Sequence, residues 1–225
     1  KKNIKTTNTL SYQLINKNFT SIERFRSVEF NRDFNLNSAN PETNEQTVLW
    51  KMDQSVNNKK VVGINLSYIE RRKIYYGLKS AGTINTKLWK GCKLDGKGSY
   101  LKSEGQTQGS QFLRHLITFQ QKLTPQLTVK LWEEEEWNPI LNIEMDTLAS
   151  NSFRYTVLGS ELKIENSENT SFSLTGNQRI DFLPMNNLLN KVTTGKNAGV
   201  KFTKNSKKGS DFLWSSTFRE LTINR

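Results

Sequence analysis

The chain has 225 residues, a mass of 26.0 kDa and a net charge of +12, with 33 Lys and Arg against 21 Asp and Glu. This length fits one large domain or two small ones and can bury a sizeable core. No run of about 18 apolar residues occurs, so we expect no transmembrane segment within the chain. With one cysteine and one histidine, a disulfide framework, a cysteine-rich zinc site and a multi-histidine metal site are excluded. We expect no cofactor and no metal, and the single thiol leaves the compartment unknown.

The N-terminal segment predicts a polar arm followed by a helix. Apolar residues recur at helical spacing at Leu10, Leu14, Phe19, Ile22 and Phe25. Thr20 and Glu23 have the spacing of a capping box, in which each side chain satisfies the other residue's backbone N–H. We therefore predict a helix over 21–33 and treat residues 1–34 as an N-terminal arm and helix.

From residue 48 onward the apolar residues alternate with polar ones, which is typical of strands. Residues 35–225 are therefore predicted to form a single antiparallel β domain, and the glycine-rich segment 91–109 is read as a loop and a candidate sub-boundary. Short breaks predict tight returns, with Gly159-Ser160 and Gly176-Asn177 as candidate hairpin turns.

The segment 110–124 fits either a helix or a long strand, and its stripe of Phe112, Leu116, Phe119 and Leu123 slightly favours the helix. About ten strands with short returns predict a mainly β fold, an antiparallel meander that forms a barrel or a sandwich.

Charge is distributed unevenly along the chain. Residues 59–102 carry a net +9 and residues 191–208 a net +6, whereas residues 113–190 between them carry −4. In the first block basic and aromatic residues interleave, a composition that can follow a phosphate backbone and stack bases; a solvated edge strand protected by its charges explains the same pattern. The candidate partner-binding residues are Arg71, Arg72, Lys73, Tyr75, Lys79, Lys87, Trp89, Lys90, Lys93, Lys201, Lys204, Lys207 and Lys208.

Three smaller features carry alternative chemistry. Glu133 to Glu136, between two tryptophans, could hold a hard cation or dock a basic patch, but a charged turn explains them more simply. Asp146, Glu161 and Lys163 have the order of a Mg²⁺ nuclease trio, a pattern that is common by chance. His115 lies in an apolar stretch, as a hydrogen-bonded core histidine does.

The leading hypothesis is a non-enzymatic binding or assembly protein whose basic face (59–102 and 191–208) docks an anionic partner, namely nucleic acid, an acidic protein or polymer, or further copies of the chain. One alternative is a meander β-barrel that binds an apolar or aromatic small ligand. Another is an anchored, pilin-like surface subunit, suggested by the order of a helix and then a sheet. A Mg²⁺ nuclease built on Asp146 is the weakest alternative.

Overall fold

A computed structural model describes residues 3–18, 44–57, 59–72, 74–167, 170–205 and 211–224, and the description below concerns these residues. They form thirteen strands. The bounds are β1 Ile4–Ile15, β2 Glu45–Val56, β3 Lys59–Arg71, β4 Tyr75–Lys87, β5 Cys92–Gly105, β6 Gln108–Lys122, β7 Leu127–Asn138, β8 Ile140–Asn142, β9 Thr147–Leu148, β10 Phe153–Ser167, β11 Thr170–Met185, β12 Leu188–Asn205 and β13 Asp211–Ile223.

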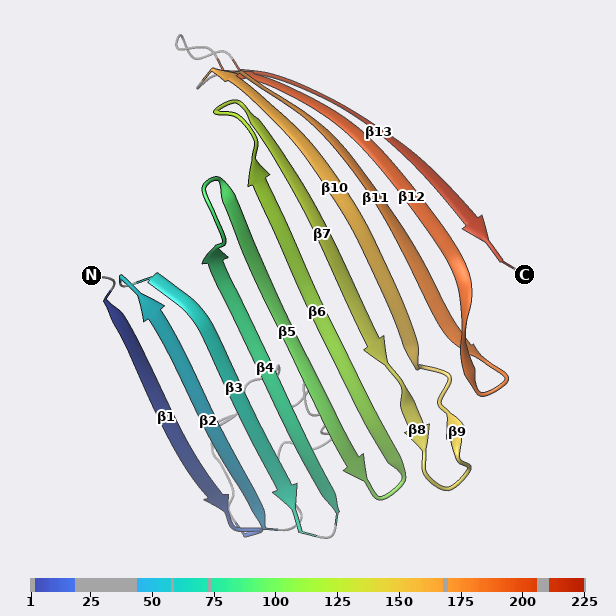
Figure 1. Cartoon of the computed structure of the whole chain (residues 1–225). Helices are drawn as coiled ribbons and strands as arrows, with labels where there is room; N and C mark the ends of the chain where they lie inside the picture. Colours follow the sequence, from blue (N-terminus) through green and yellow to red (C-terminus); the bar gives the residue numbers. More distant parts are fainter. Residues whose placement is uncertain are drawn as a thin grey trace. The chain divides into compact units, whose positions relative to one another are not determined.

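The strands follow one another in a meander. Each strand pairs with its neighbour in the chain, in the order β1-β2-β3-β4-β5-β6-β7-β10-β11-β12-β13 (Figure 1). The short strands β8 and β9 lie off this path, and β8 pairs with β6. The predicted mainly β antiparallel meander is therefore confirmed.

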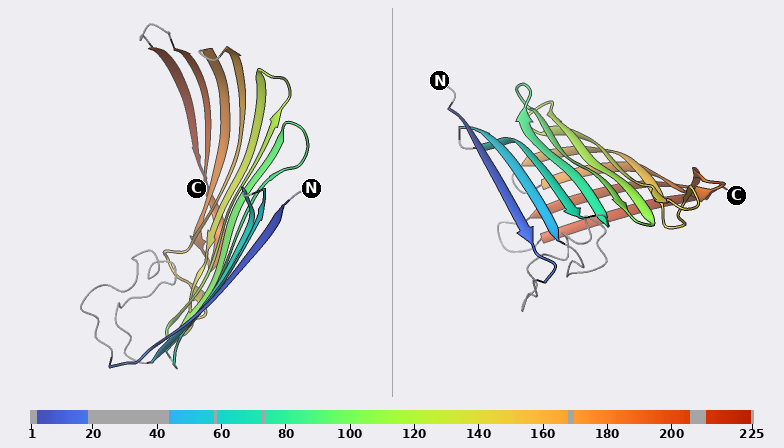
Figure 2. Two further views of the ribbon diagram at one scale, coloured as in Figure 1. Left: turned by 90° about the vertical axis from the view of Figure 1, so that its left-hand side faces the viewer. Right: turned by 90° about the horizontal axis from the view of Figure 1, so that it is seen from below.

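The chain divides into two compact units. Unit 1 comprises residues 1–84, 97–114 and 137–152, and unit 2 comprises residues 85–96, 115–136 and 153–225. Within each unit the described strands lie side by side in a single layer (Figure 2). The pairs β1–β2, β2–β3 and β3–β4 belong to unit 1, and β10–β11, β11–β12 and β12–β13 belong to unit 2.

The predicted closure into a barrel or sandwich is wrong. In the strand order β1 and β13 are the two ends, so the described sheet is open, and neither unit contains a second described sheet stacked on the first. Short connections between successive strands predict a meander. They do not determine whether the sheet closes, because closure depends on whether the two end strands are paired.

The segment 110–124 is a strand and not a helix. It forms most of β6, which runs from Gln108 to Lys122, because the neighbouring strands β5 and β7 offer ladder partners on both sides. The described residues contain no helix, and so none that is long and apolar enough to cross a membrane. The predicted helix over 21–33 lies outside the described residues, whereas Leu10 and Leu14, which belonged to the same helical pattern, are in β1.

Several predicted loops are also strands. The glycine-rich segment 91–109 contains β5, and Gly91, at φ +80°, sits in the turn that precedes it. Gly159-Ser160 and Gly176-Asn177 are no turns, since Gly159 pairs with Asn177 and Ser160 with Gly176 across β10 and β11. The return from β11 to β12 uses Asn186 and Asn187 instead, whose φ values of 52° and 63° suit a tight two-residue hairpin.

The described residues bury little apolar surface. Their buried hydrophobic side chains are Ile15, Ile69, Cys92, Leu101 and Ile140. Only Ile69 and Leu101 form a cluster, with Tyr75 and Phe112 against it. The sizeable core expected from the chain length is therefore missing in this part of the chain, and most large apolar side chains lie on a surface.

Candidate functional site

In unit 1 the apolar side chains share one face of the sheet. Residues paired across antiparallel strands point to the same face, so the strand registers assign each side chain to a face. One cross-strand row joins Tyr12, Val48, Tyr68 and Leu78. We define the apolar band of unit 1 as the residues of this row and its neighbours on the same face: Leu10, Tyr12, Val48, Trp50, Met52, Val62, Ile64, Leu66, Tyr68, Leu78 and Ile84.

The opposite face of unit 1 is mainly polar on its edge strand, but it also carries Leu49 and the buried Ile69. Its edge strand β1 presents Lys5, Thr7, Thr9, Ser11 and Gln13 there. On the next two strands the row of Lys51 and Asn65 and the row of Leu49 and Ser67 share this face. An ion pair joins Lys51 to Asp53, with 3.2 Å between Nζ and the carboxylate. Alternate residues of the same strands therefore separate apolar from polar chemistry.

Unit 2 repeats this separation on β10 to β13. The row Ile164, Phe172, Phe202 and Trp214 is followed by the row Leu162, Leu174, Val200 and Ser216. We define the apolar band of unit 2 as the large apolar residues on this face: Leu158, Leu162, Ile164, Phe172, Leu174, Val200, Phe202, Trp214 and Phe218. Phe218 is 66% exposed and Leu158 is 53% exposed, so no described element covers them.

The opposite face of unit 2 carries hydrogen-bonding groups in every row. Successive rows read Lys163, Ser173, Lys201 and Ser215, then Glu161, Thr175, Gly199 and Thr217, then Gly159, Asn177, Asn197 and Arg219. The Asn197 amide donates to the Asn177 side-chain oxygen at 2.9 Å. Further along, Arg179 and Thr193 both donate to the Asp181 carboxylate at 2.8 Å.

Trp132 is the large aromatic side chain on this polar face, and Gly159 makes room for it. A Cβ at Gly159 would lie 2.1 Å from the Trp132 ring, closer than any real contact. The Lys130 ammonium also lies over the indole, 5.4 Å from its centroid. The glycine in mid-strand is thus explained by the close approach of Trp132 rather than by a turn.

Charged groups on the apolar face of unit 1 lie at the ends of the strands and pair with tyrosines. The Tyr68 hydroxyl donates to the Glu70 carboxylate at 2.9 Å, and the Tyr76 hydroxyl donates to Glu104. These four residues line a shallow pocket of about 300 Å³ at the β3–β4 and β5–β6 turns. The apolar band of unit 1 is therefore bordered by aromatic rings whose polar tips point to carboxylates.

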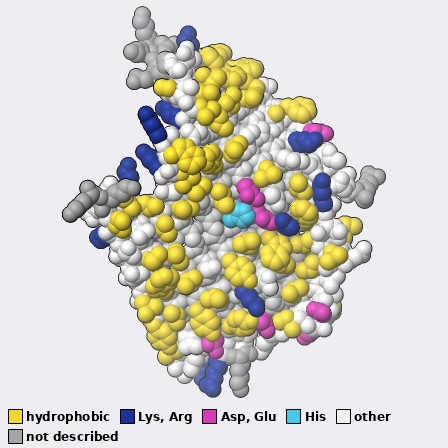
Figure 3. Space-filling model, viewed as in Figure 1, with side chains coloured by type: hydrophobic (Ala, Val, Ile, Leu, Met, Phe, Trp, Pro, Cys, Tyr) yellow, Lys and Arg dark blue, Asp and Glu magenta, His cyan; other side chains and the backbone are white. Residues whose placement is uncertain are grey.

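In unit 2 a charged cluster joins β6, β7 and β10. His115 Nε2 lies 3.9 Å from Glu133, and the Arg154 guanidinium donates to Glu135 at 2.7 Å. The four consecutive glutamates lie in β7. Unlike Glu133 and Glu135, the carboxylates of Glu134 and Glu136 accept from the Tyr155 hydroxyl, at 2.9 and 3.1 Å. Figure 3 shows the histidine beside carboxylates on a face where hydrophobic side chains predominate.

This cluster is a poor metal site. Ligand atoms of His115, Glu133 and Glu135 lie within 4.8 Å of one another, but the guanidinium of Arg154 already occupies the Glu135 carboxylate. A positive group beside the carboxylate competes with a cation for it.

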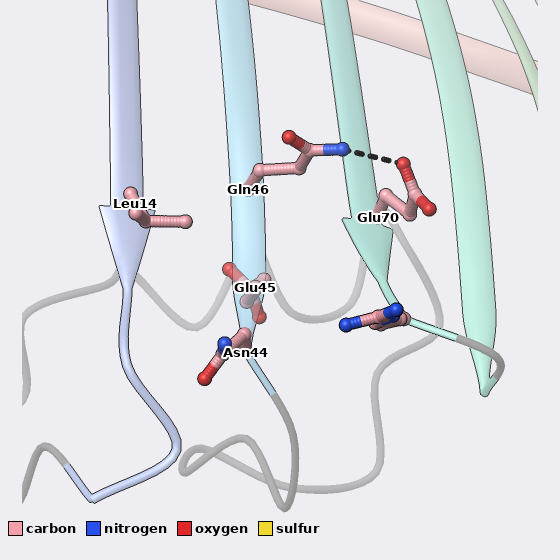
Figure 4. Close-up of a pocket in the computed structure, with 6 residues that line it drawn as sticks. Leu14, Asn44, Glu45, Gln46 and Glu70 are labelled. Atoms are coloured by element: carbon pink, nitrogen blue, oxygen red, sulfur yellow. Dashed lines mark hydrogen bonds between the residues drawn. The ribbon is translucent and has the colours of Figure 1, made fainter.

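A second pocket, of about 260 Å³, lies at the end of β1 to β3 and is lined by Leu14, Asn44, Glu45, Gln46, Glu70 and Arg72. In Figure 4 the Gln46 amide reaches across to the Glu70 carboxylate, at 2.5 Å. Next to it the Arg71 guanidinium bonds to Glu45, which is 0% exposed, at 2.9 Å. These contacts join β2 to β3, so the pocket residues have a structural role.

The structure distributes the predicted partner-binding residues over several places. Arg71 is buried in its ion pair with Glu45, and Lys93 pairs with Asp95 at 2.8 Å. Arg72, Lys87, Trp89 and Lys90 are exposed near turns, and Tyr75 and Lys79 are half-buried on β4. Lys201 and Lys204 are exposed on β12, and Lys73, Lys207 and Lys208 lie outside the described residues.

The second basic block is divided between the two faces of its strand. Lys201 and Lys204 are three residues apart on β12 and so point to opposite faces. A basic face that docks an anionic partner stays a hypothesis.

The candidate nuclease residues do not form a described cluster. Asp146 lies in the turn between β8 and β9 in unit 1, whereas Glu161 and Lys163 lie on β10 in unit 2. The Lys163 ammonium pairs with Glu165 at 2.5 Å.

Comparisons with protein-family models, with curated protein sequences and with solved structures gave no match. The function therefore has to be argued from the two faces of the sheet. The sequence predicted most of the alternation but not the uncovered apolar face. The signal for it in the sequence is the lack of a second amphipathic layer that could cover this face.

Proposed function

We propose that the chain forms part of a membrane-spanning β-sheet, in which the apolar bands of units 1 and 2 contact lipid acyl chains and the opposite face meets water. The observation that carries this proposal is the largely apolar face of β1 to β4 and of β10 to β13, on which the described residues place no second layer. Lipid-embedded strands alternate apolar residues toward lipid with polar residues toward the interior.

The composition of the bands supports lipid as the partner. The four complete cross-strand rows of unit 1 from Tyr12 to Thr6 and the three of unit 2 from Ile164 to Ser160 contain no charged residue, although 24% of the chain is charged. In the last row of the unit 2 band, that of Leu158, the same face carries the ion pair of Lys196 and Glu220. A charge facing hydrocarbon costs about 2–4 kcal/mol at the bilayer midplane, which explains their confinement to the borders.

Strand length supports the same proposal. The described long strands have 12 to 18 residues, and a tilted transmembrane strand needs about 9–11. Each strand is therefore long enough to cross the hydrocarbon layer and extend beyond it. The tyrosines at the border of the unit 1 band, Tyr68 and Tyr76, suit the interface, where an apolar ring and a polar tip are both satisfied.

Exposure of the apolar bands to water instead of lipid would be unfavourable in free energy. Burying one large apolar side chain is worth about 1.5–3 kcal/mol, and the unit 2 band alone presents nine such side chains. Soluble monomers rarely expose contiguous apolar patches larger than a few hundred Å². Lipid removes this cost without requiring any further protein layer.

The natural tryptophans allow a direct test. Variants that keep only Trp50, only Trp214 or only Trp132, with the other tryptophans changed to Phe, are reconstituted into vesicles of phosphatidylcholine brominated on its acyl chains. Trp50 and Trp214 belong to the apolar bands, and Trp132 on the polar face is the matched control. We expect strong quenching of Trp50 and Trp214 and little quenching of Trp132. Equal quenching of all three, or of none, would contradict the proposal.

A further inference from the structure

Strand β12 carries a lysine at each end of the apolar band of unit 2. Residues two apart on a strand share a face, so Lys196 and Lys204 point to the same side as the alternate residues between them, Ala198, Val200 and Phe202. Both lysines are exposed. They are eight residues apart, which is about 26 Å along a strand that rises about 3.3 Å per residue. The band therefore has two borders within unit 2, one at each lysine.

The border at Lys196 contains as many carboxylates as cations. Lys196 pairs with Glu220 at 3.6 Å, and further along the same face Arg154 pairs with Glu135 at 2.7 Å. On β7 and β10 to β13, the charged side chains described on this face, from the row of Leu158 outward, are Lys191, Lys196, Arg154, Glu133, Glu135 and Glu220. Three positive and three negative groups leave this border without a net charge.

The border at Lys204 has a different charge. The row of Lys204 also contains Thr170 and Phe212, and neither these residues nor the next row, that of Phe202, add a charge. Of the acids on β13, Glu220 belongs to the other border, and the side chain of Asp211 lies outside the described ones. Among the described side chains of β10 to β13, Lys204 therefore gives this border a net positive charge.

Aromatic side chains gather beside Lys204. Phe202 and Phe212 lie with their ring centroids 6.1 Å apart, and Trp214 is paired in register with Phe202. Phe172 completes this row from β11. Phe212 and Trp214 are both exposed. The last apolar row before Lys204 is therefore the aromatic end of the band.

The aromatic group continues at the β4–β5 turn of unit 2. Trp89 is 57% exposed, its ring lies 6.0 Å from that of Phe119, and its indole N–H donates to Gln121 at 2.9 Å. Phe119 is four residues after His115 on β6 and so shares its face. The indole thus has an apolar contact on one side and a satisfied polar tip, which is the arrangement that suits tryptophan at a membrane interface.

These features together fit the headgroup region of a lipid bilayer. Aromatic rings are favoured at that depth, and the long stem of a lysine lets its ammonium reach the headgroups while the stem stays in an apolar layer. Net-negative lipids attract a lysine near the membrane surface. We propose that the border at Lys204 binds net-negative phospholipid headgroups and that the charge-balanced border at Lys196 does not. This inference rests on the proposed function and adds the class of lipid and the residue that selects it.

The test uses a variant in which Trp214 is the only tryptophan, with the other four changed to Phe. Its fluorescence is measured in vesicles that mix phosphatidylcholine with phosphatidylglycerol, one of the two being brominated on its acyl chains, so that quenching gives the relative binding of the two lipids near Trp214. We expect phosphatidylglycerol to be preferred about fivefold at low salt. The preference should fall toward one at about 1 M salt, where charges are screened within about 3 Å.

The three described lysines in this part of β12 supply the variant and its controls. Lys204→Gln should abolish the preference and Lys204→Arg should keep it, whereas Lys196→Gln and, on the opposite face, Lys201→Gln should leave it unchanged. A preference that is absent from the parent, that survives Lys204→Gln, or that falls equally in either control overturns the inference.

The same measurement separates this inference from the proposed function. Quenching of Trp214 by brominated phosphatidylcholine alone reports contact with acyl chains and does not depend on headgroup charge. Strong quenching without a preference that depends on Lys204 overturns the headgroup inference and leaves the lipid proposal intact. Absence of quenching by both brominated lipids overturns both.

Discussion

On β10, Leu158, Leu162 and Ile164 point to one face of the sheet, whereas Glu161 and Lys163, their chain neighbours, point to the other. The two faces share one backbone and one set of ladder hydrogen bonds. They differ only in which of the alternating residues of each strand point to them. The apolar face carries mainly exposed apolar side chains, whereas the polar face carries mainly charged and hydrogen-bonding side chains. The contrast implies that the two sides of one layer meet different solvents.

The largest expected effect concerns the buried charge pair in unit 1. Glu45→Gln leaves the Arg71 guanidinium without its 2.9 Å carboxylate partner in a buried position. We expect a loss of about 3–5 kcal/mol in the free energy of unfolding, measured by denaturant titration in vesicles. Glu70→Gln, at a half-buried carboxylate, is the control and should cost far less. Equal losses would show that burial does not distinguish the two sites.

A charge placed on each face tests the contrast directly. Leu162→Arg puts a guanidinium into the unit 2 band, and Thr175→Arg puts one on the polar face opposite Glu161. In lipid vesicles we expect Leu162→Arg to lower the free energy of unfolding by about 2–4 kcal/mol and Thr175→Arg by less than about 1 kcal/mol. The proposal fails if the two variants lose similar stability.

The glycines in mid-strand provide a test of packing on the polar face. Gly159→Ala forces a Cβ into the Trp132 ring, whereas Gly176→Ala meets nothing closer than 3.9 Å. Overpacking of this kind costs about 1–3 kcal/mol, so only Gly159→Ala should destabilise the chain clearly. Combining Gly159→Ala with Trp132→Ala should remove the interaction. Additive losses in this double-mutant cycle would show that the ring and the glycine are not coupled.

The smallest effect is expected at the border of the unit 1 band. Tyr68→Phe removes the hydroxyl that donates to Glu70 at 2.9 Å, and we expect a loss of about 1 kcal/mol. Tyr12→Phe, in the same cross-strand row on the exposed edge strand, should cost less. A smaller loss for Tyr68→Phe than for Tyr12→Phe would argue against a border role for this hydroxyl.

The sequence predicted the strands better than their closure. Alternation at Val48, Trp50 and Met52, and at Val62, Ile64 and Leu66, gave the correct faces of β2 and β3, because the pleat has a strict period of two. The misassigned segment 110–124 is apolar on both faces, with Phe112 and Leu113 adjacent, so its period was ambiguous.

Some features could not be predicted because they depend on partners across the sheet. Gly159 reads as a turn residue until Trp132, on the neighbouring strand, is seen to pack over it. Arg71 is predicted from the sequence to contact an external partner, but in the structure its guanidinium pairs with Glu45, 26 residues earlier in the chain.

The most direct test of the two-solvent account is a spin-label scan along β10. Single cysteines at positions 158 to 165, in a Cys92→Ser background, carry a nitroxide in lipid vesicles, and collision rates are measured with oxygen and with a water-soluble nickel complex. The account predicts alternation, with oxygen favoured at 158, 160, 162 and 164 and nickel favoured at 159, 161, 163 and 165. Equal access of the nickel complex to both sets would contradict it.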